Sequence, residues 1–369
     1  MLIGVFHPFL NICGGAEWVA VNVINNLEKA GHRVVVLSKE KIDQKKIKDA
    51  FGTTVKAEKE VILPFQFFHD GDLHNVYTDG LRLLFLKTKC DLLIDTCSNA
   101  LLPGADISYI HFPIAGRLTT YESRLPSAFF NPYFIYELSQ ARKNRKLILV
   151  NSKYTLHTMR KLTGASPTLL YPPISKSFYI NSNDLDKKEN VVVSLSRLVR
   201  QKRVQLIPYI AKITDKSIRF KIVGHKGTAW ELRQIHESIE KNGVSDRVEV
   251  ITSASRNELH QILQESKVFL HLQVGEHFGV AVAEAMASGC IPIVNDSGGP
   301  REFVPQHLRF TQLREASKKI EKAILEWAPQ KSKTMINLAK SFDEDAFSAK
   351  FNESISLYMK RYSKVGSTD

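Results

Sequence analysis

Two glutamates, Glu276 and Glu284, lie eight positions apart in the stretch "VGEHFGVAVAEAMASGCIPIVNDSGGP". A carboxylate accepts hydrogen bonds from hydroxyls, and a ribose or a hexose presents such hydroxyls in pairs. Glu276 follows an apolar run over 268–274 that predicts a strand, whereas Glu284 lies in a small-residue run that predicts a helix ending at Gly289. The pair could therefore hold the sugars on either side of a diphosphate, or be two exposed acids around an ordinary turn.

The helix expected after Gly279 offers unpaired N–H groups and the positive end of its dipole. Such a helix start is a natural binding position for a phosphate. The alanines of this helix allow it to pack closely against a sheet; they are Ala281, Ala283, Ala285 and Ala287.

A basic turn in "SLSRLVRQKRV", at the end of the expected strand run "NVVVSLSRL", contains Arg197 and Lys202. A nucleoside diphosphate leaving group develops negative charge as its bond breaks, and cations already in place stabilise that charge. Arginine suits bidentate phosphate contact, and lysine acts as a point charge. The alternative is a solvated basic turn, and we place Arg200 and Arg203 on the solvated side.

Two further candidates lie in the first half of the chain. Gly14 and Gly15 in "NICGGAEW" permit close backbone approach and open a helix N-terminus. This loop is not GxGxxG, so it does not indicate a dinucleotide site. His111 ends the apolar run "ISYIHF", where it could reach a ligand. A plain tight turn and a packing histidine are the alternatives.

The chain that must position these residues alternates strand-like and helix-like runs over 369 residues, which predicts two α/β domains with parallel sheets. Pro172-Pro173 and the polar run after them break the pattern. We therefore predict an N-terminal domain over 1–172, a C-terminal domain over 173–341 and a C-terminal helix over 342–369. The expected strands are "LIGVF", "RVVVLS", "DLLIDT", "DISYIHF", "KLILVNS", "NVVVSLSRL", "IRFKIVG", "RVEVIT", "KVFLHLQV" and "CIPIVND".

Composition narrows the class of protein further. The hydrophobic fraction is 43% and the charged fraction is 24%, as in a soluble globular protein. No apolar run approaches the roughly 18 residues of a membrane span, and the start "MLIGVFHPFL" predicts a strand and not a signal peptide. The four cysteines form no CxxC pair, so a reduced, cytoplasmic setting is expected.

The quoted motifs resemble those of GT-B glycosyltransferases of the family 4 type, in which two glutamates are separated by seven residues. Here that signature is "EHFGVAVAE", and "SGGPREFV" matches the Gly-Gly loop that follows it. Within the family, the donor-site motif is most similar to that of α-1,2-mannosyltransferases that act on dolichol-linked oligosaccharide. The resemblance implies two Rossmann-like, doubly wound domains facing a central cleft, with the C-terminal helix packing back on the N-terminal domain.

The resemblance also implies residue roles and partners. Glu276 would lie near the transferred sugar and Glu284 on the ribose, while Arg197 and Lys202 would bind the diphosphate. The remaining donor-binding candidates are Gly14, Gly15, His277, Phe278 and Gly279, and His111 would lie beside the reacting sugar. The expected reaction is retaining hexosyl transfer, with mannose favoured, from GDP-mannose or a UDP-sugar to a glycan or lipid-linked acceptor. No metal or other cofactor is expected.

The formal net charge of +13 fits several partners, since nucleic acid, an anionic membrane and phosphorylated substrates all attract a basic protein. Between Arg124 and Lys161 there are eight basic residues against one acid, Glu137, together with five aromatic residues between 129 and 136. This mixture suits a peripheral position at the inner face of a membrane. No nucleic-acid motif accompanies it, so no nucleic-acid partner is expected.

Two alternatives to a glycosyltransferase stay open at this point. Nucleotide-sugar epimerases and phosphorylase-like enzymes share the architecture, although an epimerase needs a further acid/base set that the sequence does not reveal. A basic peripheral membrane or nucleic-acid binding protein is the non-enzymatic alternative, in which the two glutamates would have no chemical role.

Overall fold

The structure is a computed structural model that describes residues 1–63, 73–114, 131–142, 145–224 and 227–365. The chain divides into two compact units. The first comprises Met1–Pro173 together with Glu344–Asp369, and the second comprises Ile174–Asp343. The sequence analysis drew the corresponding limits at residue 172, the first of the two prolines, and at residue 341, shortly before the last helix begins at Glu344.

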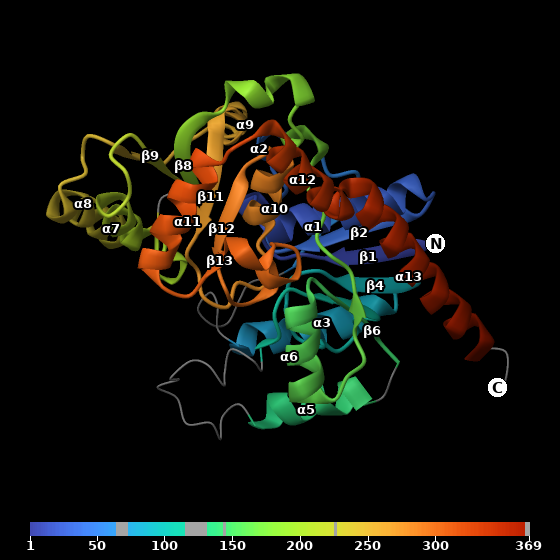
Figure 1. Cartoon of the computed structure of the whole chain (residues 1–369). Coiled ribbons are helices and arrows are strands. Elements are labelled where there is room, and N and C mark those ends of the chain that lie inside the picture. The colour runs from blue at the N-terminus through green and yellow to red at the C-terminus, as the bar shows by residue number, and fades with distance from the viewer. Residues whose placement is uncertain (64–72, 115–130, 143–144, 225–226, 366–369) are drawn as a thin grey trace. The chain divides into compact units, whose positions relative to one another are not determined.

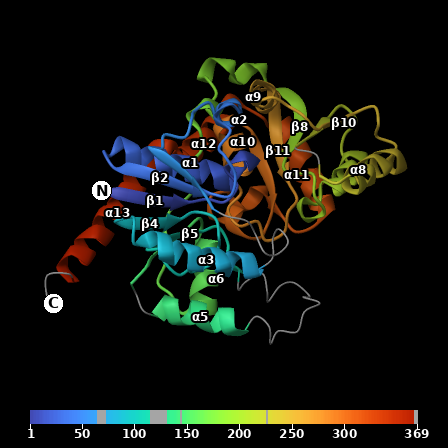
Figure 2. The same cartoon turned by 180° about the vertical axis from the view of Figure 1, so that it is seen from behind.

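The first unit is built on a seven-stranded sheet in the order β3-β2-β1-β4-β5-β6-β7. All its recorded strand pairs are parallel. Figure 2 shows the neighbouring strands β2, β1 and β4. The strands are β1 (Leu2–Phe6), β2 (Arg33–Ser38), β3 (Lys59–Ile62), β4 (Leu92–Asp95), β5 (Ile107–Ile110), β6 (Leu147–Val150) and β7 (Thr168–Leu169).

Both faces of this sheet are buried, which explains why its strands are apolar runs without alternation. In β4, Leu92 and Ile94 join the core that contains α1, whereas Leu93 joins the opposite core that contains Leu83 of α3. The helices of the unit are α1 (Gly15–Lys29), α2 (Gln44–Phe51), α3 (Leu73–Lys87), α5 (Asn131–Arg142), α6 (Lys153–Thr163) and α13 (Glu344–Val365).

The last helix, α13, belongs to the first unit although it follows the second in sequence (Figure 1). Its apolar side chains recur at helical spacing and enter the core formed by α1 and the first sheet. The predicted return of the C-terminal helix to the N-terminal domain is therefore confirmed. The buried side chains of α13 in this core are Phe347, Phe351, Ile355 and Tyr358.

The second unit contains a six-stranded sheet in the order β10-β9-β8-β11-β12-β13, and all its recorded pairs are parallel. Its strands are β8 (Glu189–Leu195), β9 (Arg219–Val223), β10 (Val248–Ile251), β11 (Ser266–His271), β12 (Ile291–Asn295) and β13 (Arg309–Phe310). Its α-helices are α7 (Ile207–Lys212), α8 (Ala229–Asn242), α9 (Arg256–Glu265), α10 (Val280–Ala287), α11 (Leu313–Leu325) and α12 (Pro329–Ala339).

The strand order reverses once in each sheet, between β1 and β4 and between β8 and β11. The carboxyl ends of strands at such a reversal are where open α/β sheets bind ligands. Four loops therefore have the best position for chemistry. They are the loops after β1, β4, β8 and β11, and they contain most of the candidate residues.

The two doubly wound sheets confirm the predicted fold class, with two local differences. The strand expected over 268–274 ends at His271, which leaves Leu272–Val274 in the loop that carries Glu276. Three strands at the sheet edges were not predicted; they are β3, β7 and β13, with four, two and two residues. No helix in the described ranges has both the length and the apolar character needed to cross a membrane.

Candidate active site

The loop after β11 holds Glu276 in a network of polar contacts. Its Oε2 atom accepts a hydrogen bond from Lys202 Nζ at 2.7 Å and lies 3.1 Å from His271 Nε2. Its Oε1 atom accepts from the backbone N–H of His277 at 3.0 Å. Two of the residues that the sequence analysis assigned to the donor, Glu276 and Lys202, thus form an ion pair within the second unit.

Charge compensation keeps the buried Glu276 carboxylate ionised. Burial raises its pKa, but the hydrogen bond with His271 and the positive charge of Lys202 outweigh burial and hold the pKa well below the usual value. The side chains of Lys202 and Glu276 are 19% and 11% exposed, so this ion pair is close to the surface. A ligand with a negative charge could therefore draw the ammonium away and leave the carboxylate to accept hydroxyl hydrogen bonds.

The turn after β8 presents the other predicted cation, Arg197, as an exposed side chain two residues beyond the strand. Lys202 follows in the short 3-10 helix η5 (Arg200–Lys202). Arg200 is exposed, as expected for the solvated side, while Arg203 is half-buried and has a positive φ of 58°. Arg197 and Lys202 therefore follow one strand at the reversal, and Glu276 follows the neighbouring strand.

Helix α10 begins directly after Gly279, which is its N-cap in a left-handed conformation with φ of 95°. Glycine has no side chain with which to cap the helix, and among the described residues no side chain is recorded as an acceptor for its first N–H groups. The predicted helix and its start are confirmed. Three of the four alanines, Ala283, Ala285 and Ala287, are completely buried, as expected for close packing.

The Gly-Gly loop "SGGP" owes its glycines to contact with the Glu276 loop. Gly298 has φ of 71°, and a Cβ on it would lie 2.2 Å from the carbonyl oxygen of Glu276. A Cβ on Gly299 would lie 2.3 Å from the carbonyl oxygen of His277, and the Gly299 N–H donates to Glu276 O at 2.7 Å. The two loops therefore pack backbone against backbone, which fixes the position of Glu276.

Glu284 lies in α10 with a half-buried side chain. Burial raises the pKa of its carboxyl to about 7, and the positive charge of Arg256 opposes that shift only in part. In the part of the chain that the structure describes, no hydrogen bond to this carboxyl is recorded. A group of this kind gains from a ligand that donates hydrogen bonds to its charged form.

The structure separates the roles of His277 and Phe278. His277 is half-buried beside Glu276, whose carboxylate accepts from its backbone N–H. Phe278 is only 2% exposed, and its ring contacts Phe303 and Phe342 at centroid distances of 5.1 and 5.2 Å. The ring is thus a core side chain that offers no surface to a ligand, so the predicted donor-binding role of Phe278 would rest on its backbone.

The remaining candidates lie at the carboxyl edge of the first sheet, in the other unit. Gly14 is the N-cap of α1 and Gly15 is its first residue. The Gly14 N–H donates to Glu17 Oε2 at 2.7 Å, so this amide is already used within the chain. His111 follows β5, is half-buried, and its Nε2 lies 3.1 Å from the carbonyl oxygen of Thr96.

Sequence reasoning missed two residues of the second unit. His271 is 4% exposed at the end of β11, and a polar residue ending a buried strand was the available signal. The other is Arg256, whose positive charge lowers the pKa of Glu284. Its guanidinium donates hydrogen bonds to Ser175 Oγ at 3.0 Å and to Ser177 Oγ at 2.6 Å. No motif marks Arg256, because its partners lie about 80 positions away in the chain.

Among the described residues, no group of three or more His, Cys, Asp or Glu side chains is arranged to hold a metal ion.

Known proteins resemble this chain in both sequence and fold. Residues 175–345 match the family model "Glycosyl transferases group 1", and this range closely coincides with the second unit. Among curated proteins, the human GDP-Man:Man(3)GlcNAc(2)-PP-Dol alpha-1,2-mannosyltransferase is 26% identical, covering 82% of this chain and 73% of that protein. The Dictyostelium discoideum protein of the same name is 28% identical over 183 residues, which are 44% of this chain and 36% of that protein.

Solved structures share the whole architecture at low sequence identity. Anabaena Alr3699/HepE in complex with UDP and glucose has a TM-score of 0.72 at 17% identity, covering 96% of this chain and 99% of that one. Sucrose-phosphate synthase from Thermosynechococcus elongatus has a TM-score of 0.77 at 14% identity, covering 99% and 100%. The architecture is therefore the GT-B fold. Residues 175–345 are similar to the group 1 glycosyltransferases.

Proposed function

We propose that the protein is a retaining glycosyltransferase that moves a hexose from a nucleoside diphosphate sugar to a hydroxyl of a glycan. The observation that carries this proposal is the Lys202–Glu276 ion pair at the strand-order reversal of the second sheet. A diphosphate is the kind of ligand that competes with a carboxylate for a lysine. The epimerase and the binding-protein alternatives are not favoured, because the matching family model describes glycosyl transferases and the curated relatives are named mannosyltransferases.

The residues of the second unit divide the work of donor binding and leaving-group stabilisation. Arg197, Lys202 and the open N-terminus of α10 stabilise the diphosphate as it takes up charge. Once Lys202 turns to the phosphate, Glu276 is held in place by His271 and accepts hydroxyl hydrogen bonds from the hexose. Glu284 accepts from the ribose hydroxyls, and this contact favours its ionised form.

In the retaining reaction, the acceptor oxygen attacks the anomeric carbon from the face that the diphosphate leaves. The carbon–oxygen bond to the diphosphate breaks as the new glycosidic bond forms, and a phosphate oxygen takes the proton of the acceptor hydroxyl. The cations named above supply the charge stabilisation that a metal ion supplies elsewhere. We therefore propose a metal-independent reaction.

Mannose is the proposed sugar, GDP-mannose the proposed donor, and a lipid-linked oligosaccharide the proposed acceptor. Support comes from the human and Dictyostelium relatives, which are named GDP-Man:Man(3)GlcNAc(2)-PP-Dol alpha-1,2-mannosyltransferases. The fold neighbour with bound UDP supports a nucleotide donor site of this architecture without choosing the base.

We expect transfer from GDP-mannose to a lipid-linked oligosaccharide acceptor to give an α-linked product from the α-linked donor. The rate should be unchanged by excess EDTA. Proton NMR of the product determines the anomeric configuration, and release of GDP measures the rate. A β-linked product would contradict retention, a loss of activity in EDTA would contradict metal independence, and efficient use of UDP-glucose alone would contradict mannose.

The basic and aromatic region between Arg124 and Lys161 supports a peripheral membrane position at the cytoplasmic face. Residues 115–130 and 143–144, including Arg124, Phe129, Phe130 and Lys143, lie outside the described residues. Arg145 is exposed, but Lys146 is not a surface cation. Its Nζ donates to the carbonyl oxygens of Leu102 and Ala105, and burial lowers its pKa to about 8. Lys146 therefore does not belong to a membrane-binding set.

A sedimentation experiment with vesicles tests membrane attachment. We expect the protein to bind vesicles containing anionic lipid at low salt and to dissociate at high salt, since each engaged cation contributes about 1 kcal/mol near an anionic surface. Neutralising Arg142, Lys143 and Arg145 together should weaken binding. The matched control neutralises Lys212, Lys216 and Lys241 of the second unit. Equal loss in both variants, or no binding to anionic vesicles at low salt, would contradict a dedicated membrane surface.

A further inference from the structure

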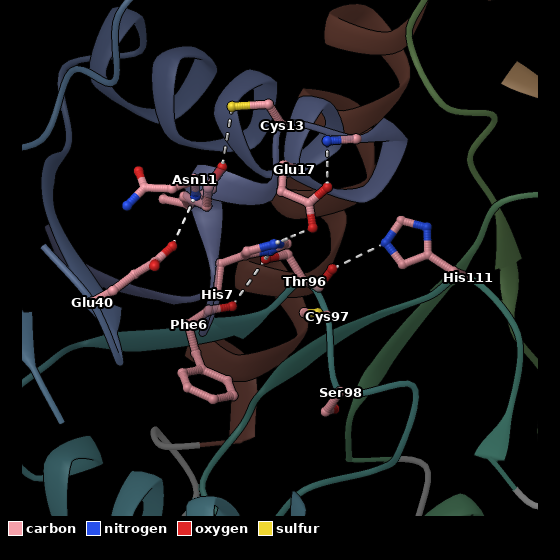
Figure 3. A network of polar contacts seen from close by, with 12 residues as sticks. Phe6, His7, Asn11, Cys13, Glu17, Glu40, Thr96, Cys97, Ser98 and His111 are labelled. Atoms are coloured by element: carbon pink, nitrogen blue, oxygen red, sulfur yellow. Dashed lines mark hydrogen bonds and ion pairs between the residues drawn. The ribbon is translucent and has the colours of Figure 1, made fainter. Parts of the chain in front are cut away.

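A buried polar network lies at the strand-order reversal of the first sheet (Figure 3). His7 follows β1 directly and is completely buried. Its Nδ1 lies 2.9 Å from Thr96 Oγ1, and its Nε2 lies 3.4 Å from Glu17 Oε1 in the first turn of α1. Thr96 follows β4. The network thus connects β1 and β4, the two strands at the reversal, with the start of α1.

The contact with Glu17 requires a proton on His7 Nε2. Burial raises the pKa of Glu17, but the hydrogen bond with His7 outweighs burial, so the net shift is downward and the carboxylate is ionised. An ionised carboxylate only accepts hydrogen bonds, and therefore His7 Nε2 carries a proton and donates it to Glu17. The other oxygen of Glu17 accepts from the Gly14 N–H at 2.7 Å, which fixes the backbone at the start of α1.

The same network reaches His111 through Thr96. His111 Nε2 lies 3.1 Å from the Thr96 carbonyl oxygen and donates to it, while Asn99 Oδ1 accepts from the backbone N–H of His111 at 2.7 Å. Asp95, also buried, accepts from the N–H groups of Cys97 and Ser98 at 3.1 Å and thereby holds the turn that follows Thr96. Its place in this turn accounts for a carboxylate at the end of β4.

From these contacts we infer that Glu17, His7 and Thr96 are positioning residues that hold the glycine loop and the His111 imidazole in a fixed mutual geometry. A fixed geometry matters because reacting groups must be aligned within fractions of an ångström. Glu17 sets the helix start that follows Gly14, and Thr96 sets the ring orientation and the tautomer of His111. None of the three is exposed enough to contact a substrate itself, since Glu17 is 6% exposed and the other two are completely buried.

This inference rests on the proposed glycosyl transfer, and its test uses the full-length protein with variants that separate positioning from folding. His7→Leu removes both polar contacts of the ring. His7→Gln keeps a side-chain N–H that can reach Glu17, and Thr96→Val removes only the hydroxyl while leaving the carbonyl that His111 uses. The control is Val23→Ala, which empties part of the same core in α1, where Val23 is completely buried, without touching the network.

The expected result is a split between kcat and KM. His7→Leu should lower kcat about tenfold or more with the donor KM within about twofold, because the proposed donor contacts lie in the second unit. His7→Gln should recover most of kcat, Thr96→Val should fall between the two, and Val23→Ala should lower the melting temperature without changing kcat. An unchanged kcat in folded His7→Leu, or an equal loss in Val23→Ala, would overturn the inference.

Hydrogen exchange gives a second readout that does not need activity. His7→Leu should increase exchange of the amides over 9–18 and over 96–112 together, whereas Val23→Ala should increase exchange within α1 without affecting 96–112. If His7→Leu fails to fold, the same two segments are measured in Thr96→Val, with the same expected increase in exchange. Wild-type protein that transfers no sugar would refute the proposed function alone, while loss of protection in only one of the two segments would refute the network.

Discussion

Replacing Lys202 with alanine is expected to lower kcat about 100-fold to 1000-fold, the usual cost of removing one preorganised group that stabilises developing charge. Donor affinity should fall much less, because the charge on the diphosphate is greatest in the transition state. The change also leaves the buried Glu276 carboxylate with His271 as its remaining side-chain partner. The measurement is steady-state kinetics with GDP-mannose as the varied substrate.

Two further variants separate charge from position at this site. Lys202→Arg keeps the positive charge and should retain part of kcat, whereas Arg200→Ala removes an exposed cation from the same 3-10 helix and should change kcat little. Equal losses in kcat and donor affinity for Lys202→Ala would mean that the lysine binds ground state and transition state alike. A larger loss for Arg200→Ala would place the leaving group elsewhere on this turn.

Replacing Glu284 with glutamine is expected to weaken donor binding while making the protein more stable at alkaline pH. Burial raises the pKa of this carboxyl to about 7, so folding opposes its ionisation. The penalty is absent below the unfolded pKa, grows as the pH rises from there, and is complete above pH 7. Glu284→Gln should therefore increase the free energy of unfolding by about 1–2 kcal/mol at pH 8 and by nothing at pH 4.

The loss of donor affinity in the same variant has a separate cause. Hydrogen bonds to a charged group contribute about 1.5–3 kcal/mol, so losing the ribose contacts should weaken GDP binding about tenfold or more. For the wild type, GDP affinity should rise as the pH increases through 7, because the ribose favours the ionised carboxylate. Glu240→Gln, an exposed change on α8, is the matched control for both effects. Stabilisation without loss of GDP affinity would remove Glu284 from the site.

The sequence predicts most of this architecture because fully buried parallel strands are recognisable as short apolar runs. Both doubly wound sheets and helix α10 follow from such runs and from the small residues that pack against them. The short strands β3, β7 and β13 do not, because their pairing depends on neighbours far away in the chain. The early end of β11 at His271 was missed, because Leu272 and Val274 continue the apolar pattern beyond it.

The candidate site was predictable where residue type and strand end coincide, as at Arg197, Lys202 and Glu276. Their pairing was not, because the Lys202–Glu276 contact joins residues 74 positions apart. The burial of Phe278 depends on Phe303 and Phe342, which no local pattern connects with it. The His7–Glu17–Thr96 network likewise depends on β1 and β4 being neighbours in the sheet, which a sequence pattern alone does not show.

The central claim is that the loops after β8 and β11 bind a nucleoside diphosphate. The most direct test is a thermal-shift panel of GDP, UDP, ADP and inorganic pyrophosphate with the wild type, Glu284→Gln and Lys202→Ala, since a ligand of the folded state raises the melting temperature. In the wild type, GDP should raise the melting temperature more than the other three ligands do. The rise with GDP should be smallest in Glu284→Gln and intermediate in Lys202→Ala. A melting temperature that no nucleoside diphosphate raises, or one that all of them raise equally in the three proteins, would contradict the claim.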